Sequence, residues 1–317
     1  MSMFLLRRLA GAVLMLLVVG TVIFLMLVLV PGDPAELLLS TGGSAASPEA
    51  IANLRASMGL DAPLPVQYVE FLWNSARFDF GTSIIDGSSI AESIALRLPR
   101  TLEIIAAGTV LALLVALPAG TAAGLHAGGR FDVAASAANA LLTSIPGFVL
   151  GTLFIFLFAQ ILGWLPAGGY VPFAQDPMQH LRMLVLPAVT VGLHLSTIVF
   201  RMTRASVLEM RGHDWVRTAI AKGLTRRRVV RRHVVKNAMG PVLTVVGMQL
   251  GILLGSTVLI EFVYNWPGLS GLLITAVEQR DFPTVRAIIL TVAAIFIAIN
   301  LVIEILHSLL DPRIRLQ

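Results

Sequence analysis

The chain has 317 residues, of which 56% are hydrophobic and only 13% are charged, and its formal net charge at pH 7 is +5. This hydrophobic fraction, with a mean hydropathy of +0.86, exceeds what a soluble domain needs to fill a core and indicates a membrane protein. The sequence has no cysteine, which excludes disulfides, thiolate metal sites and cysteine nucleophiles.

Six apolar runs without Asp, Glu, Lys or Arg are each about long enough to cross a bilayer, which takes roughly 17–25 helical residues. In chain order they are 9–30, 104–125, 133–163, 183–200, 241–260 and 287–303. The first run is longer than the apolar part of a cleaved signal peptide, which favours a membrane anchor. The third is too long for one straight helix, and Pro146-Gly147 near its middle predicts a kink or a break.

The segment between the first two runs, residues 31–100, is too polar for lipid and is expected outside the cytoplasm. Within it, Ser47 and Pro48 are typical of a helix start, and Gly59 is typical of a helix stop. A second helix is predicted over 66–73. This segment can cover the mouth of a pore or serve as a docking surface for an external protein, and the two roles are compatible.

The connection between the fourth and fifth runs is strongly basic. Eight of the 23 Lys and Arg residues lie within residues 217–241, and no acidic residue accompanies them. Gly223 can end a first helix in the left-handed conformation, and Thr225 can cap a second helix over 226–238. Pro241 is then expected to open the fifth run in the first turn of its helix.

The second helix of this connection is predicted to have two unlike faces. Residues spaced i, i+4 and i+8 are apolar on one face, at Val230, Val234 and Ala238, and basic on the other, at Arg228, Arg232 and Lys236. Three explanations compete: a solvated loop that fixes membrane orientation, a nucleic-acid-binding element, and a docking element for a cytoplasmic partner. Because a loop tied to spans at both ends cannot easily enter a major groove, we expect no nucleic acid and favour docking.

Lys and Arg are unevenly divided between the alternate connections. If the N-terminus lies in the cytoplasm, the cytoplasmic segments are 1–8, 126–132, 201–240 and 304–317, and they hold sixteen of the 23 Lys and Arg residues. The positive-inside rule therefore predicts six spans with both termini and the basic connection in the cytoplasm. The phosphate-binding pattern G-x-x-x-x-G-K-S/T does not occur, so this chain is not expected to bind ATP itself.

A few polar residues lie in or near the spans, where they are costly unless partnered. They are Asn139, His194, Gln249, Ser256 and Asn300. Of these, His194, Gln249 and Ser256 are candidates for lining a transport pathway, and hydrogen bonding between helices is the plainer alternative for each. The fifth run also repeats glycine every four residues, at Gly247, Gly251 and Gly255. Such a repeat permits either a close helix approach or a pore lining of small residues.

Short motifs recur in order along nearly the whole chain. The basic connection reads Asp214-Trp215-Val216-Arg217-Thr218-Ala219-Ile220-Ala221-Lys222-Gly223-Leu224, followed by His233, Asn237-Ala238 and Pro241. The others are Pro31-Gly32-Asp33-Pro34, Gly59-Leu60-Asp61, Asp79-Phe80-Gly81-Thr82-Ser83, Leu98-Pro99-Arg100-Thr101-Leu102-Glu103, Trp164-Leu165-Pro166, Leu186-Pro187-Ala188, Glu261, Trp266-Pro267-Gly268-Leu269, Arg280-Asp281-Phe282-Pro283 and Leu310-Asp311-Pro312-Arg313. In order and spacing they resemble the permease subunits of ABC importers, in the dipeptide, oligopeptide and nickel branch, and in particular its first, B-type permease.

This resemblance implies an all-α membrane protein with the six-helix type I (MetI-like) permease fold and cytoplasmic termini. The chain divides accordingly into a first span (1–30), an extracytoplasmic segment (31–100) and a five-helix core (101–317) with a coupling loop over 206–240. The basic connection resembles the EAA loop, which implies a coupling helix at about 215–222 that docks on an ATPase. The residues so implicated are Trp215, Arg217, Thr218, Ala219, Ala221, Lys222, Gly223 and Leu224. Ile220 departs from the pattern, because the family commonly has Arg there.

Members of this family assemble with a second, homologous permease as a heterodimer, two ABC ATPase subunits and an extracytoplasmic solute-binding protein, within the lipid of the bacterial inner membrane. The resemblance therefore implies a transport subunit that is not itself an enzyme and has no cofactor or metal. The expected solute is a di- or oligopeptide, and nickel or a metal chelate is the alternative within the family. An ion-coupled secondary transporter is the alternative from another class, although no Asp or Glu lies within the six runs.

Overall fold

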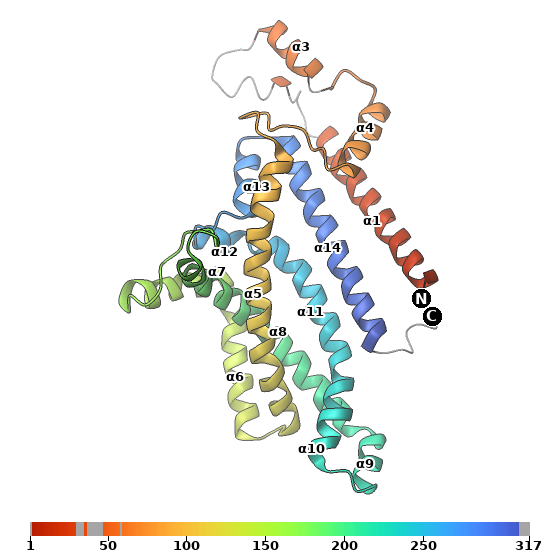
Figure 1. Cartoon of the computed structure of the whole chain (residues 1–317), viewed down its shortest axis with the longest axis vertical. Coiled ribbons are helices and arrows are strands. Elements are labelled where there is room, and N and C mark those ends of the chain that lie inside the picture. The colour runs from red at the N-terminus through yellow and green to blue at the C-terminus, as the bar shows by residue number, and fades with distance from the viewer. Residues whose placement is uncertain (1, 30–34, 37–46, 58, 311–317) are drawn as a thin grey trace. The chain divides into compact units, whose positions relative to one another are not determined.

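The structure of the chain is a computed structural model that describes residues 2–29, 35–36, 47–57 and 59–310. Most of them lie in helices, and within these ranges no strand forms apart from an isolated bridge between Thr82 and Ser89 (Figure 1). The predicted all-α class is confirmed. Two of the motifs, Pro31-Gly32-Asp33-Pro34 and the terminal Asp311-Pro312-Arg313, lie outside the described residues.

The helices follow one another in the order labelled in Figure 1. The first are α1 (Ser2–Val28), α3 (Pro48–Ser57), α4 (Leu64–Ala76) and α5 (Ile90–Leu125). The next are α6 (Arg130–Ser144), α7 (Gly147–Phe154), the π-helical η2 (Ile155–Ile161) and α8 (Pro177–Gly212). The last are α9 (Asp214–Ala221), α10 (Arg226–Val229), the π-helical η3 (Val230–Val235), α11 (Lys236–Ser256), α12 (Val258–Val263), α13 (Leu269–Glu278) and α14 (Phe282–Leu310).

The predicted spans are recovered with one qualification. Among the residues that the structure describes, five helical segments are long and apolar enough to cross a membrane: Leu6–Met26, Ile90–Leu125, Pro177–Gly212, Arg226–Ser256 and Phe282–Ile305. A sixth span forms only if α6 and α7–η2 count together, because the chain turns by 98° between them. The predicted break at Pro146-Gly147 is confirmed, since Ile145 and Pro146 are extended and end the helix there.

The chain forms two compact units. One comprises Ser2–Leu96 and Leu272–Ile297, and the other comprises Arg97–Gly271 and the chain from Ala298 on. In the first of these units, α1 and α4 pack together. The hydroxyls of Thr21 and Tyr68 lie 2.7 Å apart, and the Phe24 ring packs against the Tyr68 ring.

The helices predicted within residues 31–100 both form. The Ser47 hydroxyl accepts a hydrogen bond from the Ala50 amide at 3.2 Å, and Gly59 follows the end of α3 with a φ of 67°. This confirms the predicted start and stop of α3. The α4 helix is longer than the predicted 66–73, because Pro65 is accommodated in its first turn, where the missing N–H has no helical partner.

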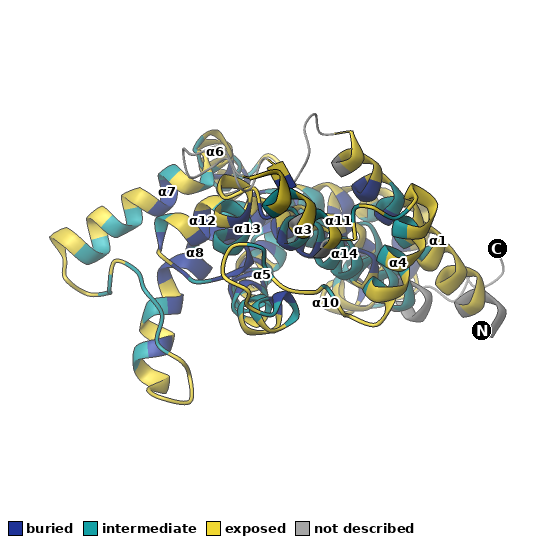
Figure 2. Cartoon of the chain, turned by 90° about the horizontal axis from the view of Figure 1, so that it is seen from above, coloured by how far each residue is buried: buried dark blue, intermediate teal, exposed yellow. Residues whose placement is uncertain are grey.

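The α8 helix is the central element of the second unit. About two thirds (67%) of the apolar stretch of α8 is buried, against 33% or less of that stretch in each of the other four helices that could span a membrane. Figure 2 shows the buried residues of α8 in dark blue. Beside it, α5 repeats a small residue every four positions: Gly108, Ala112, Ala116, Gly120 and Gly124. A Cβ atom at Gly120 would lie 2.8 Å from Thr203 Cβ, and one at Gly124 would lie 2.8 Å from the Arg204 carbonyl oxygen. The stripe of small residues therefore lets the α5 backbone approach α8 closely.

A polar network joins two of the motifs that lie far apart in the sequence. The buried Glu261 carboxylate accepts hydrogen bonds from the Thr101 hydroxyl at 2.6 Å and from the Ser270 amide at 2.9 Å. Thr101 Oγ1 in turn accepts from the Leu269 amide, and Trp266 Nε1 donates to the Arg100 carbonyl oxygen at 3.0 Å. Burial raises the pKa of the Glu261 carboxyl, while the hydrogen bonds from Thr101 and Ser270 lower it.

Replacement of this carboxylate should destabilise the second unit. Glu261→Ala leaves the Thr101 hydroxyl and the Ser270 amide without their acceptor in a buried site, at a cost of about 1–3 kcal/mol. We expect a lower midpoint in thermal unfolding of the purified chain in detergent. Because the folded state holds the Glu261 proton more tightly than the unfolded state, native stability should also fall as pH rises above the ordinary carboxyl range. That decline should be absent from Glu261→Gln, and an equal decline in the variant would contradict the assignment.

Three details of the basic connection differ from expectation. Thr225 precedes α10, yet its side chain makes no capping hydrogen bond. The second helix does not stop at residue 238 but continues from Arg226 to Ser256. Pro241 therefore lies inside α11 and not in its first turn. The π-helical segment η3 ends six residues ahead of this proline.

The glycine repeat of the fifth run is only partly used for close packing. A Cβ atom at Gly247 would lie 2.7 Å from Ile303 Cγ1, so α11 and the end of α14 approach closely there. At Gly255 a Cβ atom would meet nothing within 4 Å. The predicted close approach is confirmed at the first glycine, whereas the last faces open space.

Candidate functional site

The α9 helix ends in the left-handed turn predicted at Gly223. This residue has a φ of 79°, its amide donates to the Ile220 carbonyl oxygen at 2.9 Å, and the Leu224 amide donates to the Ala219 carbonyl oxygen at 3.2 Å. These two bonds form a Schellman motif, which satisfies the carbonyls at the end of a helix. A Cβ atom at Gly223 would meet nothing within 4 Å, so the backbone conformation alone favours glycine.

An apolar cluster holds α9 against its neighbours. Its buried members are Val207 from α8, Val216 and Ala219 from α9, Val229 and Val234 from α10–η3, and Ala238 from α11. Val229 and Val234 are five residues apart, and the π-helical turn brings them onto one face. The expectation that Val230 would belong to this face was wrong, because the i, i+4 pattern assumed an unbroken α-helix.

The predicted loop residues divide into two groups. Ala219 is buried in the cluster, and Leu224 packs against it from the side. The exposed ones are Trp215, Arg217, Thr218, Ala221, Lys222 and Gly223. Ile220, noted as a departure from the family pattern, is 53% exposed and adds an apolar side chain to this surface. These exposed residues form the outer surface of α9.

Stacked rings connect α9 to the helix that follows it. The His213 ring stacks on the Trp215 ring with a centroid distance of 5.8 Å. The ring of His233, which lies in η3, has its centroid 6.2 Å from that of Trp215. His213 had not been identified from the sequence, because ring stacking between residues two apart at a helix start has no pattern of its own. The three rings add a second contact between α9 and η3.

The end of α8 that leads into α9 is tied to neighbouring helices. Arg204 donates two hydrogen bonds to the buried Asp132 carboxylate, at 2.5 and 2.8 Å, and the Gly128 amide donates to the same carboxylate at 2.9 Å. Arg211 donates to the Leu125 carbonyl oxygen at 2.5 Å. These contacts link α8 to the turn between α5 and α6. The α9 helix is therefore connected to the spans through α8 and the 226–256 helix.

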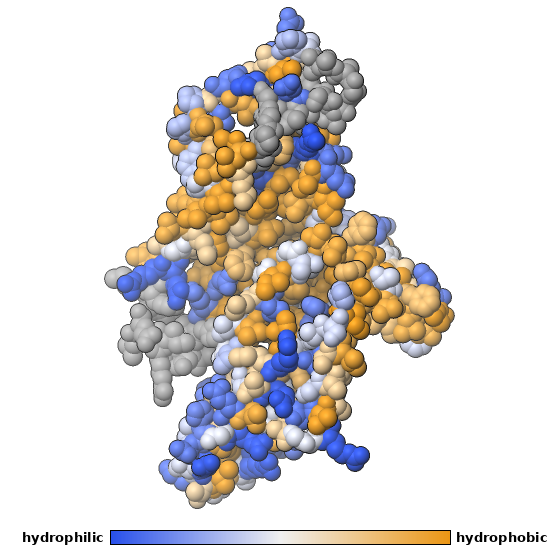
Figure 3. Space-filling model, turned by 180° about the vertical axis from the view of Figure 1, so that it is seen from behind, coloured by the Kyte–Doolittle hydropathy of each residue, from blue (hydrophilic) through white to orange (hydrophobic). Residues whose placement is uncertain are grey.

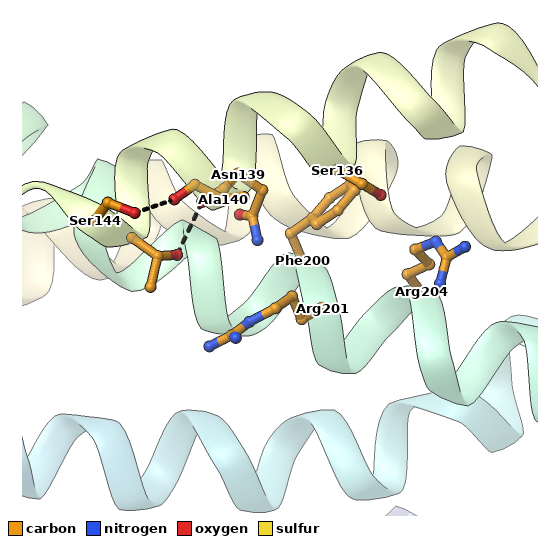
Figure 4. A pocket seen from close by; sticks show the side chains of 8 residues that line it. Ser136, Asn139, Ala140, Ser144, Phe200, Arg201 and Arg204 are labelled. Atoms are coloured by element: carbon orange, nitrogen blue, oxygen red, sulfur yellow. Dashed lines mark hydrogen bonds between the residues drawn. The ribbon is translucent and has the colours of Figure 1, made fainter.

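A polar pocket of about 500 Å³ lies between α6 and α8 (Figure 4). Its lining residues are Ser136, Asn139, Ala140, Thr143 and Ser144 from α6, and Phe200, Arg201 and Arg204 from α8. The Asn139 amide donates to the Thr197 carbonyl oxygen at 3.1 Å, which bears out the plainer expectation of an interhelical hydrogen bond. Arg201 is exposed and, unlike Arg204, has no acidic partner within the described part of the chain.

The three residues predicted to line a pathway lie elsewhere. His194 is half-buried on α8, whereas Gln249 is half-buried and Ser256 exposed on α11, and none of them lines the polar pocket. Their assignment to a pathway stays a prediction. Arg201 was not singled out from the sequence, because it follows the fourth apolar run directly and was counted as part of the basic connection.

Comparison with known proteins places these features in a family. Residues 108–316 match the family described as "Binding-protein-dependent transport system inner membrane component", and residues 1–105 match the family described as "Binding-prot-dependent transport system membrane comp, N-term". A putative peptide transport system permease protein of Brucella abortus is 38% identical to this chain, over 99% of both chains.

Other relatives agree with this match. The probable peptide ABC transporter permease protein y4tP of Sinorhizobium fredii is 35% identical, over 99% of this chain and 100% of the relative. The glutathione transport system permease protein GsiC of Salmonella choleraesuis is 37% identical, over 98% of both.

A solved structure shares the fold. A chain of the MetNI methionine ABC transporter, crystallised in inward-facing conformations, has a TM-score of 0.55 and covers 69% of this chain and 96% of its own, with 16% sequence identity. This likeness concerns the fold alone, and it confirms the predicted MetI-like architecture.

Family membership decides between the classes weighed from the sequence. The matched families together extend over almost the whole chain, and the full-length relatives are permease proteins. An ion-coupled secondary transporter is therefore not the class of this chain, and ATP hydrolysis in such systems resides in a separate subunit. The chain belongs to the family of inner membrane components of binding-protein-dependent transport systems, as a multi-pass permease subunit of an ABC importer.

Proposed function

We propose that this chain forms half of the translocation pathway for a peptide-like solute, with a di- or oligopeptide as the first candidate. Relatives named for peptide transport, and one named for glutathione, support this class of solute. The other half of the pathway is a second, homologous permease in a heterodimer. An import complex of this kind also contains two ATPase subunits and an extracytoplasmic solute-binding protein.

The outer surface of α9 is the proposed docking site for an ATPase subunit. The observation that carries this assignment is that a short helix with exposed Trp215, Arg217 and Ile220 is anchored by a buried cluster and closed by the turn at Gly223. Coupling between distant sites needs an element that moves as one body and biases two states of the protein. Closure of the ATPases on ATP would move α9, and the helices attached to it would switch the pathway.

The proposed orientation has both termini and α9 in the cytoplasm. It is supported by the concentration of Lys and Arg in the segments that this orientation places inside. Residues 31–100 then lie on the opposite side, where they would meet the solute-binding protein.

Affinity purification of the chain from its native host in mild detergent, followed by mass spectrometry, tests the assembly. Recovery of a second permease, ATPases and a solute-binding protein is expected. The recovered binding protein is then titrated with short peptides and with nickel or nickel chelates, because the metal importers of this family use the same architecture. Tight binding of nickel without binding of peptides would overturn the proposed solute class and leave the importer itself intact.

The polar pocket provides a test of the pathway. Arg201 is an exposed cation at the end of an apolar run and lines this pocket, so a solute that passes through the pocket would meet its side chain. Arg201→Gln should lower solute uptake by roughly 10- to 100-fold in proteoliposomes, since a hydrogen bond to a charged group contributes roughly 1.5–3 kcal/mol. Arg201→Lys retains the charge and should lose less. Equal uptake by Arg201→Gln and the wild type would remove the pocket from the pathway.

A further inference from the structure

We propose that the basic face of the helix formed by α10, η3 and the start of α11 binds the headgroups of anionic phospholipids. Docking through α9 does not explain this face, which contains most of the unusual charge of the connection. Its residues, Thr225, Arg227, Arg228, Arg231, Arg232 and Lys236, line an open hollow of about 640 Å³. In Figure 3 hydrophilic residues gather at the end of the molecule that contains α9 and α10.

These cations are uncompensated. All five are exposed, and within the described residues none of them forms an ion pair with Asp or Glu. Like charges four residues apart on a helix repel each other. An anion in the hollow would relieve this repulsion, and Arg binds phosphate oxygens through parallel N–H donors.

The basic face points away from its own chain and from the proposed docking helix. Val229, Val234 and Ala238, on the opposite face of the same helix, pack in the apolar cluster with Val216 and Ala219 of α9. The α9 helix therefore lies on the apolar side. A protein seated on the outer surface of α9 need not cover the cations.

The position of this face along the helix favours lipid over another protein. The helix continues without interruption from Arg226 to Ser256 as one of the segments apolar enough to span a membrane. Further along this helix, the apolar side chains of Met248 and Ile252 are 59% and 57% exposed. With a rise of 1.5 Å per residue, Lys236 and Met248 are about 18 Å apart along the axis. The exposed side chains of this helix thus change from cations to apolar groups along its axis, as expected for a helix that crosses from headgroups into hydrocarbon.

Lipid retention by the purified full-length chain tests this proposal. The chain is exchanged into detergent micelles with equal amounts of phosphatidylglycerol and phosphatidylcholine, and bound lipid is measured by native mass spectrometry. The wild type should retain phosphatidylglycerol preferentially. Arg228→Gln/Arg232→Gln should bind it roughly 25-fold more weakly at low salt, because each Lys or Arg near an anionic surface contributes about fivefold in affinity.

A matched variant distinguishes lipid binding by the basic face from a general effect of the positive charge of the connection. Arg217→Gln/Lys222→Gln also removes two cations, from the α9 side, and should retain phosphatidylglycerol as the wild type does. Thermal unfolding of both variants checks that they are folded. Equal retention of the two lipids by the wild type, or equal losses in the two variants, would overturn the proposal. So would unchanged lipid retention in Arg228→Gln/Arg232→Gln together with loss of the ATPase from the purified complex, because the face would then bind a protein.

Discussion

Ala219→Arg is expected to release α9 from the molecule and to abolish transport. Ala219 is buried against Val216, Val229 and Val234, and no acidic side chain lies in that cluster. An Arg there must either bury an unpaired charge or force the helix out, at a cost on the order of 3 kcal/mol, which shifts the packing equilibrium by roughly 100-fold. Trypsin should then cleave the basic connection rapidly. Co-purification of the ATPase subunits and solute uptake should be lost.

Ala221→Arg is the matched control for this change. Ala221 lies two residues further along the same helix and is exposed, so an Arg there leaves the cluster intact. We expect wild-type resistance to trypsin and weakened ATPase binding, because only the docking surface has changed. Trypsin resistance in Ala219→Arg would contradict the packing of α9. Full ATPase binding and uptake by Ala221→Arg would show that this side of α9 is not the docking surface.

The second large effect is expected at the contact between α5 and α8. Gly120→Leu places a branched side chain where a Cβ atom alone would lie 2.8 Å from Thr203 Cβ and 2.9 Å from the Phe200 carbonyl oxygen. Because one of these neighbours is backbone, the two helices must separate. Overpacking of this kind costs about 1–3 kcal/mol or more. The thermal midpoint should fall, and uptake should fall with it because α8 leads directly into α9.

Gly255→Leu is the control for the added volume. Gly255 also lies within a helix, α11, but a Cβ atom there would meet nothing within 4 Å. Its thermal midpoint should equal or exceed that of the wild type, because Leu favours helices more than Gly does. If the two substitutions lower the midpoint equally, the close approach of α5 to α8 does not determine the stability of this unit.

Features that depend only on residues adjacent in the sequence were predictable from the sequence. The break at Pro146-Gly147, the stop at Gly59 and the turn at Gly223 each follow from the backbone preferences of one or two residues. The spans are recognisable because a helix must be apolar over the thickness of a bilayer, whatever its neighbours are. The motifs of the basic connection, read together with those along the rest of the chain, also identified the permease family that the comparisons confirm.

What the sequence determined by itself is therefore the membrane class, the spans, the local turns and the family. Only the tertiary structure decided which residues meet. It brings Thr101 to Glu261, sets the small residues of α5 against α8, and opens a polar pocket beside Arg201. It also shows that Val229, and not the predicted Val230, belongs to the apolar cluster, since one π-helical turn rotates every later side chain relative to the earlier ones. The physical reason is that a turn is determined by a few adjacent residues, whereas a contact depends on the register and direction of elements far apart in the chain.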